Sequence, residues 1–355
     1  MREQKTILVA PLHWGLGHAT RCIPIIKELL KNSFNVLLAS DGAALILLQK
    51  EFPQLQSIEL PAYNIRYAKN EFLFKWKMLL QLPKIRETIA AEKKIVAQLV
   101  SENKIQGIIS DERFGVYNGK ISSVIITHQL NVLTGITTFL SSNIHEQIIK
   151  KFDSCWVPDV EDLDMNYSGK LGHIKKDVFT VTYIGILSRL KKQTLPKSID
   201  ILILISGPEP QRTTFEEMFR SIFKNSKKKV LMIRGVVETN KKIEYYGNLE
   251  IVNYMTSLEL EETINKSDLV ISRSGYTTIM DLAVLEKKAY FIPTPGQNEQ
   301  EYLAKRLTKL GIVPSCKQAD FKLEKLGDIE KYTGLKNLDA SAVNYTKLFA
   351  LFKSE

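Results

Sequence analysis

Cysteine is scarce in this sequence, and its few copies are far apart. The chain of 355 residues holds three cysteines, Cys22, Cys155 and Cys316, and none of them belongs to a CxxC pair. The five histidines form neither an HExxH motif nor another ligand spacing typical of zinc. This pattern argues against a disulfide framework and a structural metal site, and it is typical of proteins in a reducing compartment.

Long hydrophobic runs are also missing. No apolar run reaches the length of about 18 residues that a membrane-spanning helix needs. The first residues, MREQKTILVAPLHWG, pass straight into a strand-like run with no small-residue cleavage site, so a signal peptide is not expected. These absences predict a cytoplasmic protein.

Acidic residues are in the minority, with 39 Asp and Glu against 49 Lys and Arg, a net charge of +10. A basic balance suits anionic partners such as phosphorylated small molecules, nucleic acid or an anionic membrane face, although a solvated basic surface is the favoured explanation. Basic and aromatic residues gather together only at residues 70–86, so we do not expect nucleic-acid binding.

Short apolar runs alternate with amphipathic stretches along the whole chain. The first array has expected strands at residues 7–12, 34–40, 105–110 and 124–127, and expected helices at 20–31, 43–52, 72–100 and 136–152. The second has strands at 199–206, 230–233, 249–252, 269–272 and 289–293, and helices at 213–223, 259–265, 277–285 and 299–310. This alternation predicts parallel sheets that are covered by helices on both faces.

The doubled array predicts an α/β protein with two Rossmann-like, doubly wound parallel-sheet domains. We place the first domain at residues 1–185 and the second at 186–339, with a hinge in residues 181–197. A last helix is expected near residues 341–352. Because no strand follows it, we expect the segment 340–355 to pack back on the first domain.

The loop Gly15-Leu16-Gly17-His18 follows the first expected strand and leads into a helix. Ligands of open α/β sheets bind at the carboxyl ends of the strands, where such loops lie. Glycine lets the backbone approach a ligand closely, and the helix start offers N–H groups. The loop lacks the third glycine of a dinucleotide fingerprint, so a plain strand–helix turn is an equally good interpretation.

A second loop of this kind begins after the expected strand that ends at Ser272. Arg273, Ser274 and Gly275 precede a helix that starts near Thr277, so N–H groups, hydroxyls and a guanidinium converge as a diphosphate site requires. Asp281 lies about one helical turn later, where its carboxylate could bind a ribose. The alternative is that Ser274 or Thr277 merely caps the helix.

A third loop, residues 293–301, turns at two prolines and a glycine after the last expected strand. Its side chains include Gln300 and Glu301, which could bind sugar hydroxyls. The alternative is an ordinary helix start whose acidic residues suit the helix dipole.

Together these loops resemble a known family. Residues 271–307, ISRSGYTTIMDLAVLEKKAYFIPTPGQNEQEYLAKRL, are similar to the donor-binding region of the MurG-like glycosyltransferases of family 28. Residues 15–18 resemble the glycine-rich loop of that family, which ends in histidine. His128, Gln129 and Asn131 resemble its HxQN-type acceptor loop, shortened here by one residue. The resemblance implies the GT-B fold, in which two Rossmann-like domains face an interdomain cleft.

The resemblance also implies roles for individual residues. The implied donor-binding residues are Gly207, Arg212, Arg273, Ser274, Gly275, Tyr276, Thr277, Asp281, Gln297, Gln300 and Glu301. The implied acceptor-binding residues are Gly15, Gly17, His128, Gln129 and Asn131. Asp281 stands where the peptidoglycan enzyme has glutamate, and Glu301 replaces a second glutamine, which leaves the donor sugar open. The loop 206–212, SGPEPQR, departs from the expected glycine-rich sequence, so the chain resembles a divergent branch.

The implied reaction leaves negative charge on a departing diphosphate. Helix-start N–H groups, Arg273 and Arg212 would stabilise that charge without a metal. A base must also take the proton of the acceptor hydroxyl. His18 is the leading candidate because imidazole titrates near neutral pH, and Asp111 is its rival. His18 as a phosphate ligand and Asp111 as a structural cap remain the alternatives.

We therefore expect an inverting, metal-independent glycosyltransferase that moves a sugar, implied to be N-acetylglucosamine, from a UDP-sugar to a hydroxyl of an unidentified glycan or lipid-linked acceptor. No cofactor is expected besides the UDP-sugar co-substrate. One alternative is a UDP-sugar 2-epimerase, although no convincing additional carboxylate pair is found for it. The other is a non-catalytic protein that binds nucleotide sugars.

The segment from Asn70 to Arg86, NEFLFKWKMLLQLPKIR, mixes apolar and cationic side chains. Such a helix suits peripheral contact with an anionic membrane, which would place the protein on the inner face of the membrane. The alternative is an amphipathic helix that covers the sheet and keeps its lysines in water.

Overall fold

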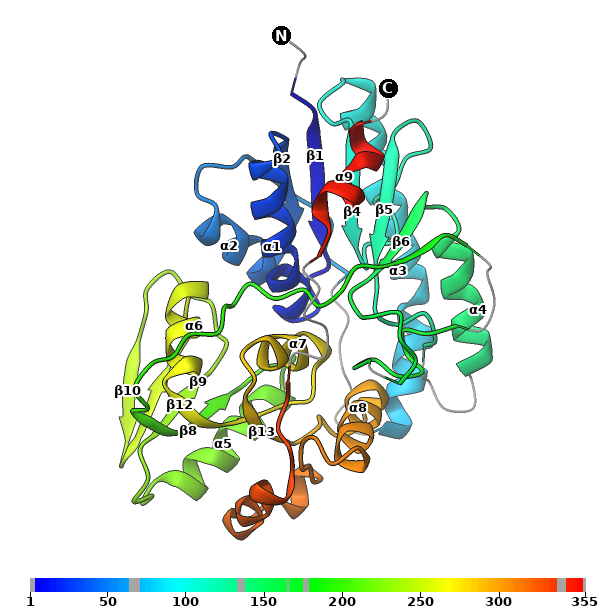
Figure 1. The fold of residues 1–355 in the computed structure, drawn as a ribbon. Helices are drawn as coiled ribbons and strands as arrows, with labels where there is room; N and C mark the ends of the chain where they lie inside the picture. Colours follow the sequence, from blue (N-terminus) through cyan, green and yellow to red (C-terminus); the bar gives the residue numbers. More distant parts are fainter. Residues whose placement is uncertain are drawn as a thin grey trace. The chain divides into compact units, whose positions relative to one another are not determined.

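The computed structural model describes residues 4–63, 71–132, 138–164, 166–174, 179–336 and 343–353, with the side chains of 71–80 and 138–141 left aside. The chain forms two compact units (Figure 1). The first unit comprises Met1–Leu187 and Asp339–Glu355, and the second comprises Ser188–Leu338. Each unit contains its own parallel sheet, as the doubled sequence pattern predicts.

The first unit is built on a sheet in the order β3-β2-β1-β4-β5-β6-β7. All neighbouring strands in it are parallel, and they are β1 (Thr6–Pro11), β2 (Asn35–Ser40), β3 (Ser57–Glu59), β4 (Gly107–Asp111), β5 (Ser122–Ile126), β6 (Ser154–Val157) and β7 (Val181–Tyr183). Its helices are α1 (Gly17–Lys31), α2 (Gly42–Glu51), α3 (Glu71–Ser101), α4 (Thr138–Ile149) and α9 (Tyr345–Lys353). Strand order reverses between β1 and β4, and this switch point is where ligands bind in such sheets.

The strands of this sheet are apolar almost throughout because helices cover both of its faces. Val9 of β1, Ile108 of β4 and Ile125 of β5 have no exposed surface. Helix α1 adds Ile23 and Ile26, which are fully buried on one face of that helix. Burying each side chain of this size stabilises the fold by roughly 1.5–3 kcal/mol.

The carboxy-terminal helix α9 belongs to the first unit, although the second unit precedes it in the chain (Figure 1, red). Its buried Phe349 and Phe352 meet Phe34 edge-on, with ring centroids 6.0 and 6.4 Å apart. A Cβ atom at Gly107 would come within 2.6 Å of the Phe352 ring. Glycine at that position therefore lets the helix pack directly against β4.

The second unit has the strand order β10-β11-β9-β8-β12-β13. The strands are β8 (Ile199–Leu204), β9 (Val230–Ile233), β10 (Ile243–Tyr246), β11 (Leu249–Val252), β12 (Ser267–Ser272) and β13 (Lys288–Phe291). The helices are α5 (Gln211–Phe223), α6 (Ser257–Asn265), α7 (Tyr276–Val284) and α8 (Asn298–Lys309), followed by the 3-10 helices η2 (Gln318–Asp320) and η3 (Leu323–Lys331). Strand β10 is antiparallel to β11, which corrects the expectation of a purely parallel sheet. A short turn at residues 247–248 allows only this antiparallel return.

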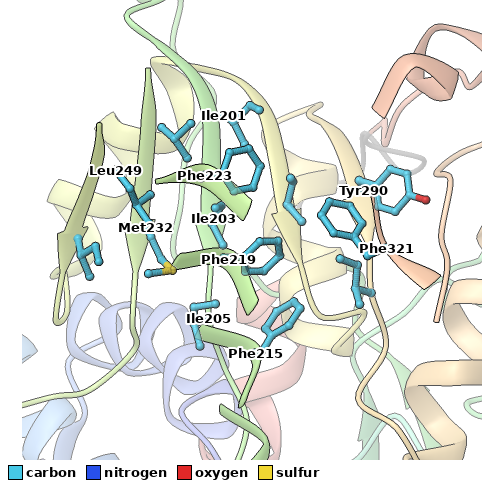
Figure 2. Close-up of a cluster of buried hydrophobic side chains, with 14 of the residues drawn as sticks. Ile201, Ile203, Ile205, Phe215, Phe219, Phe223, Met232, Leu249, Tyr290 and Phe321 are labelled. Atoms are coloured by element: carbon cyan, nitrogen blue, oxygen red, sulfur yellow. The ribbon is translucent and has the colours of Figure 1, made fainter. Parts of the chain in front are cut away.

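A row of phenylalanines on α5 forms the centre of the second core (Figure 2). Phe215, Phe219 and Phe223 recur at helical spacing, so they line one face of the helix. Consecutive ring centroids in this row lie 4.6 and 5.9 Å apart. Phe321 closes the cluster, with its ring 5.7 Å from that of Phe219.

The expected hinge at residues 181–197 is only partly a linker. Residues 181–183 form β7, an edge strand that pairs with β6, because their alternating side chains fit a sheet edge. The stretch after Ser188 lies on the second unit. The backbone N–H of Lys191 donates to Glu261 Oε2 (2.6 Å), and that of Gln193 donates to Asn265 Oδ1 (3.0 Å). Side chains of α6 thus hold this stretch against their own unit.

Within the described residues, no helix combines the length and apolarity that a bilayer crossing requires. The expected membrane-contact segment from Asn70 to Arg86 lies mostly outside the residues whose side chains are described. From Glu71 onward the segment belongs to helix α3, in which Leu82 is 42% exposed.

Candidate active site

The carboxyl ends of β1 and β4 carry a buried cluster of charged residues at the switch point of the first sheet. Pro11 at the end of β1 is the register partner of Asp111 at the end of β4. Helix α1 begins next to this edge and carries His18 and Arg21 one turn apart. His18 Nδ1 lies 2.7 Å from Asp111 Oδ1, and Arg21 Nε donates to Asp111 Oδ2 over 2.5 Å. A further bond joins Arg21 Nη2 to Asp111 Oδ1.

Asp111 is fully buried, and Arg21 and His18 contact its carboxylate from two sides. Burial alone would raise the pKa of Asp111, but Arg21 and then His18 bring it down to about 2. A carboxylate held this firmly is a poor proton acceptor at neutral pH. The contact with His18 thus favours Asp111 as the partner that orients His18 over its expected role as a rival base.

The orientation of His18 leaves one ring nitrogen for chemistry. Because Nδ1 faces the carboxylate, the neutral imidazole carries its proton there and keeps a lone pair on Nε2. Arg21 Nη2 lies 3.1 Å from Nδ1, a proximity that follows from their sharing one carboxylate oxygen. No residue in the described part of the chain bonds to Nε2, and the side chain is 16% exposed.

His128 joins the cluster from the end of β5. Arg21 Nη1 lies 3.0 Å from His128 Nδ1, so this nitrogen accepts and His128 has the opposite tautomer to His18. The neighbouring Gln129 donates its backbone N–H to Thr127 Oγ1 over 3.0 Å. His128 is thus joined through Arg21 to the same buried cluster as His18 and Asp111.

Asn131 does not present its amide to the site. Its Nδ2 donates to the carbonyl oxygens of Lys170 (2.6 Å) and His173 (2.9 Å), so it fastens its loop to the segment that follows β6. This corrects the expectation of a direct acceptor contact. The amide meets backbone groups that would otherwise be unpaired, which is the commonest use of such a side chain.

The two glycines of the first loop shape its path. Gly15 has φ +87°, a left-handed conformation that favours glycine. Gly17 begins α1, whose amino end has no hydrogen bond from a capping side chain. The loop can therefore bring His18 to the sheet edge with backbone open on its outer side, since a Cβ at Gly15 would meet nothing within 4 Å.

The second unit brings its three candidate loops together at the carboxyl ends of β8, β12 and β13, which are neighbours in the sheet. The first of these loops contains Gly207, with φ +102°. In the same loop, Glu209 Oε2 accepts hydrogen bonds from the backbone N–H (3.2 Å) and the hydroxyl (2.8 Å) of Thr213 in the first turn of α5. Arg212 Nε donates to Glu209 Oε1 over 3.0 Å. Glu209 thus already offsets the charge of Arg212, which weakens the expectation that this arginine serves phosphate.

Arg273 is buried, and its guanidinium donates hydrogen bonds to the loops that surround it. Nη1 donates to the carbonyl oxygens of Ile292 and Pro293 (3.1 Å each), and Nη2 donates to Gln318 Oε1 (2.8 Å). The group lies 3.5 Å from the centre of the Phe215 ring, and burial lowers its pKa to about 9. This placement corrects the expectation of a direct phosphate contact. All of these hydrogen-bond acceptors are neutral, so the positive charge stays beneath the loop.

The other expected donor-binding side chains bond to one another across two loops. Ser274 Oγ donates to the Gln300 carbonyl (2.7 Å), and Gln300 Nε2 donates to Gln297 Oε1 (2.5 Å). Gln300 Oε1 accepts the N–H of Thr294, and Glu301 Oε1 accepts that of Gly296 (3.2 Å). These bonds keep the start of α8 beside the start of α7.

Helix α7 starts at this point with a backbone suited to an anion. Gly275 is its N-cap, so no capping side chain occupies the helix end, and Tyr276 and Thr277 form the first turn. The nearest atom to a Cβ at Gly275 would be Thr278 Oγ1 at 3.9 Å. Asp281, further along the helix, accepts a hydrogen bond from Ser188 Oγ (2.6 Å), and burial raises its pKa to about 6.

Comparison with known proteins shows which protein family the second unit is similar to. Residues 208–337 match the model of the glycosyltransferase family 28 C-terminal domain, which lies within the second unit. A relative from Desulforamulus reducens is 24% identical over 225 residues, 57% of this chain and 56% of the relative. It is named UDP-N-acetylglucosamine--N-acetylmuramyl-(pentapeptide) pyrophosphoryl-undecaprenol N-acetylglucosamine transferase. The chain thus spans about half the length of that relative.

The fold agrees with this match. Acinetobacter baumannii MurG superposes with a TM-score of 0.55 at 14% identity, covering 99% of both chains. The chain therefore has the GT-B fold, and its second unit matches the family 28 C-terminal domain. A Listeria monocytogenes protein assigned as a UDP-N-acetylglucosamine 2-epimerase shares the MurG-like architecture, with a TM-score of 0.59, 10% identity and coverage of 98% and 95%.

Two charged residues at the switch point of the first sheet were not predicted from the sequence. Arg21 is one turn from His18 and looks like any polar residue of an amphipathic helix. Glu112 directly follows Asp111, and only the fold shows its backbone at φ +60°, a conformation that costs a residue of this kind roughly 1–3 kcal/mol. Burial would raise the pKa of Glu112, but His145 and Thr127 lower it to about 2. The one available signal was the run of polar residues at the end of a buried strand.

Among the described residues, no group of three or more His, Cys, Asp or Glu side chains could hold a metal ion. In the His18 cluster, the Asp111 carboxylate is paired with the Arg21 guanidinium.

Proposed function

We propose that the protein is a glycosyltransferase that moves N-acetylglucosamine from its UDP derivative to an acceptor hydroxyl, with His18 as the base. The 2.7 Å contact between His18 Nδ1 and Asp111 Oδ1 carries this proposal. The family 28 domain in the second unit supports the nucleotide-sugar donor. The name of the Desulforamulus reducens relative supports N-acetylglucosamine as the sugar and a lipid-linked pyrophosphate as the acceptor.

The reaction is a single displacement that inverts the anomeric carbon. The acceptor oxygen attacks that carbon while its proton passes to His18 Nε2, and the bond to UDP breaks. Asp111 holds His18 in the reactive tautomer and stabilises the imidazolium that forms, while Arg21 keeps Asp111 ionised. A well-placed base of this kind contributes about 10²–10⁴ to the rate.

The departing diphosphate is assigned to the amino end of α7. Gly275 leaves this helix end uncapped and accessible to a ligand, and the dipole of the helix favours negative charge there. Arg273 adds a buried positive charge whose bonds go only to neutral oxygens. Asp281 is placed on the same helix, and we assign it to the ribose hydroxyls, where it would exchange its bond to Ser188.

The decisive experiment measures UDP release and product formation from a set of UDP-sugars in single-turnover reactions. The acceptors are short lipid-linked pyrophosphoryl sugars and simple glycosides. We expect UDP-N-acetylglucosamine to be consumed only when an acceptor is present. Failure to bind any uridine nucleotide would reject the proposal.

The same reactions separate the two alternatives. The epimerase reading rests on a shared fold, and it requires a sugar isomer to form without any acceptor. A protein that only binds nucleotide sugars would bind UDP yet release none from a UDP-sugar.

We further propose that a lipid-linked acceptor is met at the inner face of the membrane through the segment from Asn70 to Arg86. Cosedimentation with vesicles tests this step. Binding to vesicles with anionic lipid but not to neutral ones is expected, and equal binding to both, or to neither, would reject it.

A further inference from the structure

A second imidazole–carboxylate pair lies beside the first. His13 Nδ1 is 2.9 Å from Asp41 Oδ2. Asp41 follows the end of β2, and β2 flanks β1 on the side opposite β4. The loop from β1 to α1 therefore has a histidine at each end, and each histidine meets a carboxylate at the end of a different neighbouring strand.

The second pair is supported by a buried chain of charges. Arg113, with no exposed surface, bonds to Asp41 Oδ1 and donates to Glu92 Oε1 over 2.8 Å. Glu92 Oε2 in turn accepts the hydroxyl of Tyr63 (2.8 Å) and the N–H of Gly115 (2.9 Å). Among the residues of this hydrogen-bonded network, only His13, whose side chain is 31% exposed, is appreciably accessible to solvent.

Two features indicate that this arrangement serves His13 rather than stability. Buried ion pairs stabilise a fold no better than well-packed apolar residues. Asp41 is also the N-cap of α2, yet its carboxylate makes no capping bond, although such a bond is usually worth about 1 kcal/mol. The aspartate is instead turned toward His13 and Arg113.

The ring of His13 packs directly against Gly42. A Cβ at Gly42 would come within 2.3 Å of His13 Cε1, so the imidazole rests on a residue that must be glycine. Gly42 also has φ +51°, which favours glycine. With Nδ1 bonded to Asp41, the neutral ring keeps its lone pair on Nε2, to which no residue in the described ranges bonds.

The two pairs lie at the ends of the strands that flank β1. Neighbouring strands lie about 4.8 Å apart, so the ends of β2 and β4, on either side of β1, are about 10 Å apart. Trp14, 38% exposed, follows His13 in the loop that joins the two histidines. An exposed aromatic side chain in the same loop as two hydrogen-bonding imidazoles suits a ligand ring that has polar groups at its edge and an apolar face.

We infer that His13 is a second acceptor-binding residue. Its Nε2 accepts a hydrogen bond from an acceptor hydroxyl other than the one that His18 deprotonates. The reacting end of the acceptor is therefore polyhydroxylated, and an alcohol with one hydroxyl binds without this contact. This inference rests on the proposed function, in which His18 is the base. His13 itself is a positioning residue, because it does not touch the reacting atoms.

A binding experiment tests this without turnover. The full chain, with labelled histidine rings, is titrated with methyl β-D-glucopyranoside, methyl N-acetyl-β-D-glucosaminide or cyclohexanol, and the Cε1–H resonance of His13 is followed by NMR. His13→Gln identifies that resonance by its loss. We expect a saturable shift with at least one glycoside and none with cyclohexanol. No shift with either glycoside, or the same shift with cyclohexanol, would overturn the inference.

Kinetics give a second readout with matched variants. His13→Phe keeps a ring of similar size but no nitrogen, and we expect it to raise the KM for a glycoside acceptor at least 10-fold while kcat changes less than 3-fold. His13→Gln keeps an acceptor oxygen and should recover part of the loss. A fall in kcat with KM unchanged would contradict the positioning role. If His18→Gln keeps full turnover, the proposed base is wrong, while the NMR titration still decides the role of His13.

Discussion

His18 Nδ1 and Asp111 Oδ1 lie 2.7 Å apart, although 93 residues separate the two in the chain. The contact exists because β1 and β4 are neighbours at the switch point, so the helix that follows β1 and the last residue of β4 share one edge. Arg21 holds the carboxylate from the other side. The geometry supplies an oriented imidazole with a free lone pair, which is what a proton-abstracting step requires.

Replacing His18 by alanine removes the proposed base and leaves the donor-binding loops of the second unit unchanged. We expect turnover to fall by about 10²–10⁴, the usual contribution of a general base. The affinity for UDP, measured by isothermal titration, should stay within about twofold. Turnover within threefold of the wild-type rate would show that His18 is not the base.

Asp111→Asn tests the electrostatics of the same pair. The pKa of Asp111 lies near 2 in the folded state, below its ordinary value of 3.8, so its ionised form stabilises the fold above about pH 4. That contribution, about 2 kcal/mol, is lost as the pH falls from about 4 to 2. Urea unfolding over this range should show a weaker pH dependence in the variant.

The same variant should lose roughly 3–5 kcal/mol at neutral pH, because Arg21 then lacks its buried partner. Identical pH profiles for wild type and Asp111→Asn would refute the assigned shift.

Asp281 should give the opposite pH dependence. Burial raises its pKa to about 6, above the ordinary value of 3.8, with Arg189 and Ser188 opposing the shift. The folded state therefore holds the proton more tightly, and stability falls as the pH rises from about 4 to 6. Asp281→Asn should remove this decline and weaken UDP binding at pH 7. Unchanged UDP affinity would argue against the ribose assignment.

Replacing Arg273 and Arg212 compares the stability contribution of a buried arginine that binds loop carbonyls with that of an arginine at the surface. Arg273→Met leaves the carbonyls of Ile292 and Pro293 without their donor, so we expect a loss of about 2–4 kcal/mol in urea unfolding. Arg212→Met breaks a bond to Glu209 at the surface and should cost less than about 1 kcal/mol. Equal losses for the two variants would contradict the burial of Arg273.

The local signals in the sequence were sufficient for the strands and helices around the site. Buried strands such as residues 230–233 and 249–252 were predicted to the residue, because apolar runs bounded by turn residues have few other uses. Edge strands were missed, including β7 and β10. They carry polar or mixed side chains and form only because a neighbouring strand offers hydrogen bonds.

Side-chain partners were predicted less well than positions. Arg273 and Asn131 lie in the loops where the motifs place them, yet both bond to backbone carbonyls inside the fold. A motif specifies which residue stands at the end of a strand, but the direction of its side chain depends on which polar groups the packed loops leave unpaired.

The sequence by itself determined the two α/β arrays and the loops that end their strands, and it made His18 the leading candidate base, since apolar periodicity and side-chain chemistry are local properties. Tertiary structure decided which charges meet. Only the order of strands in the sheet brings Asp111 to His18 and Asp41 to His13. Arg21 and His18 then outweigh the effect of burial and keep Asp111 ionised beside the proposed base.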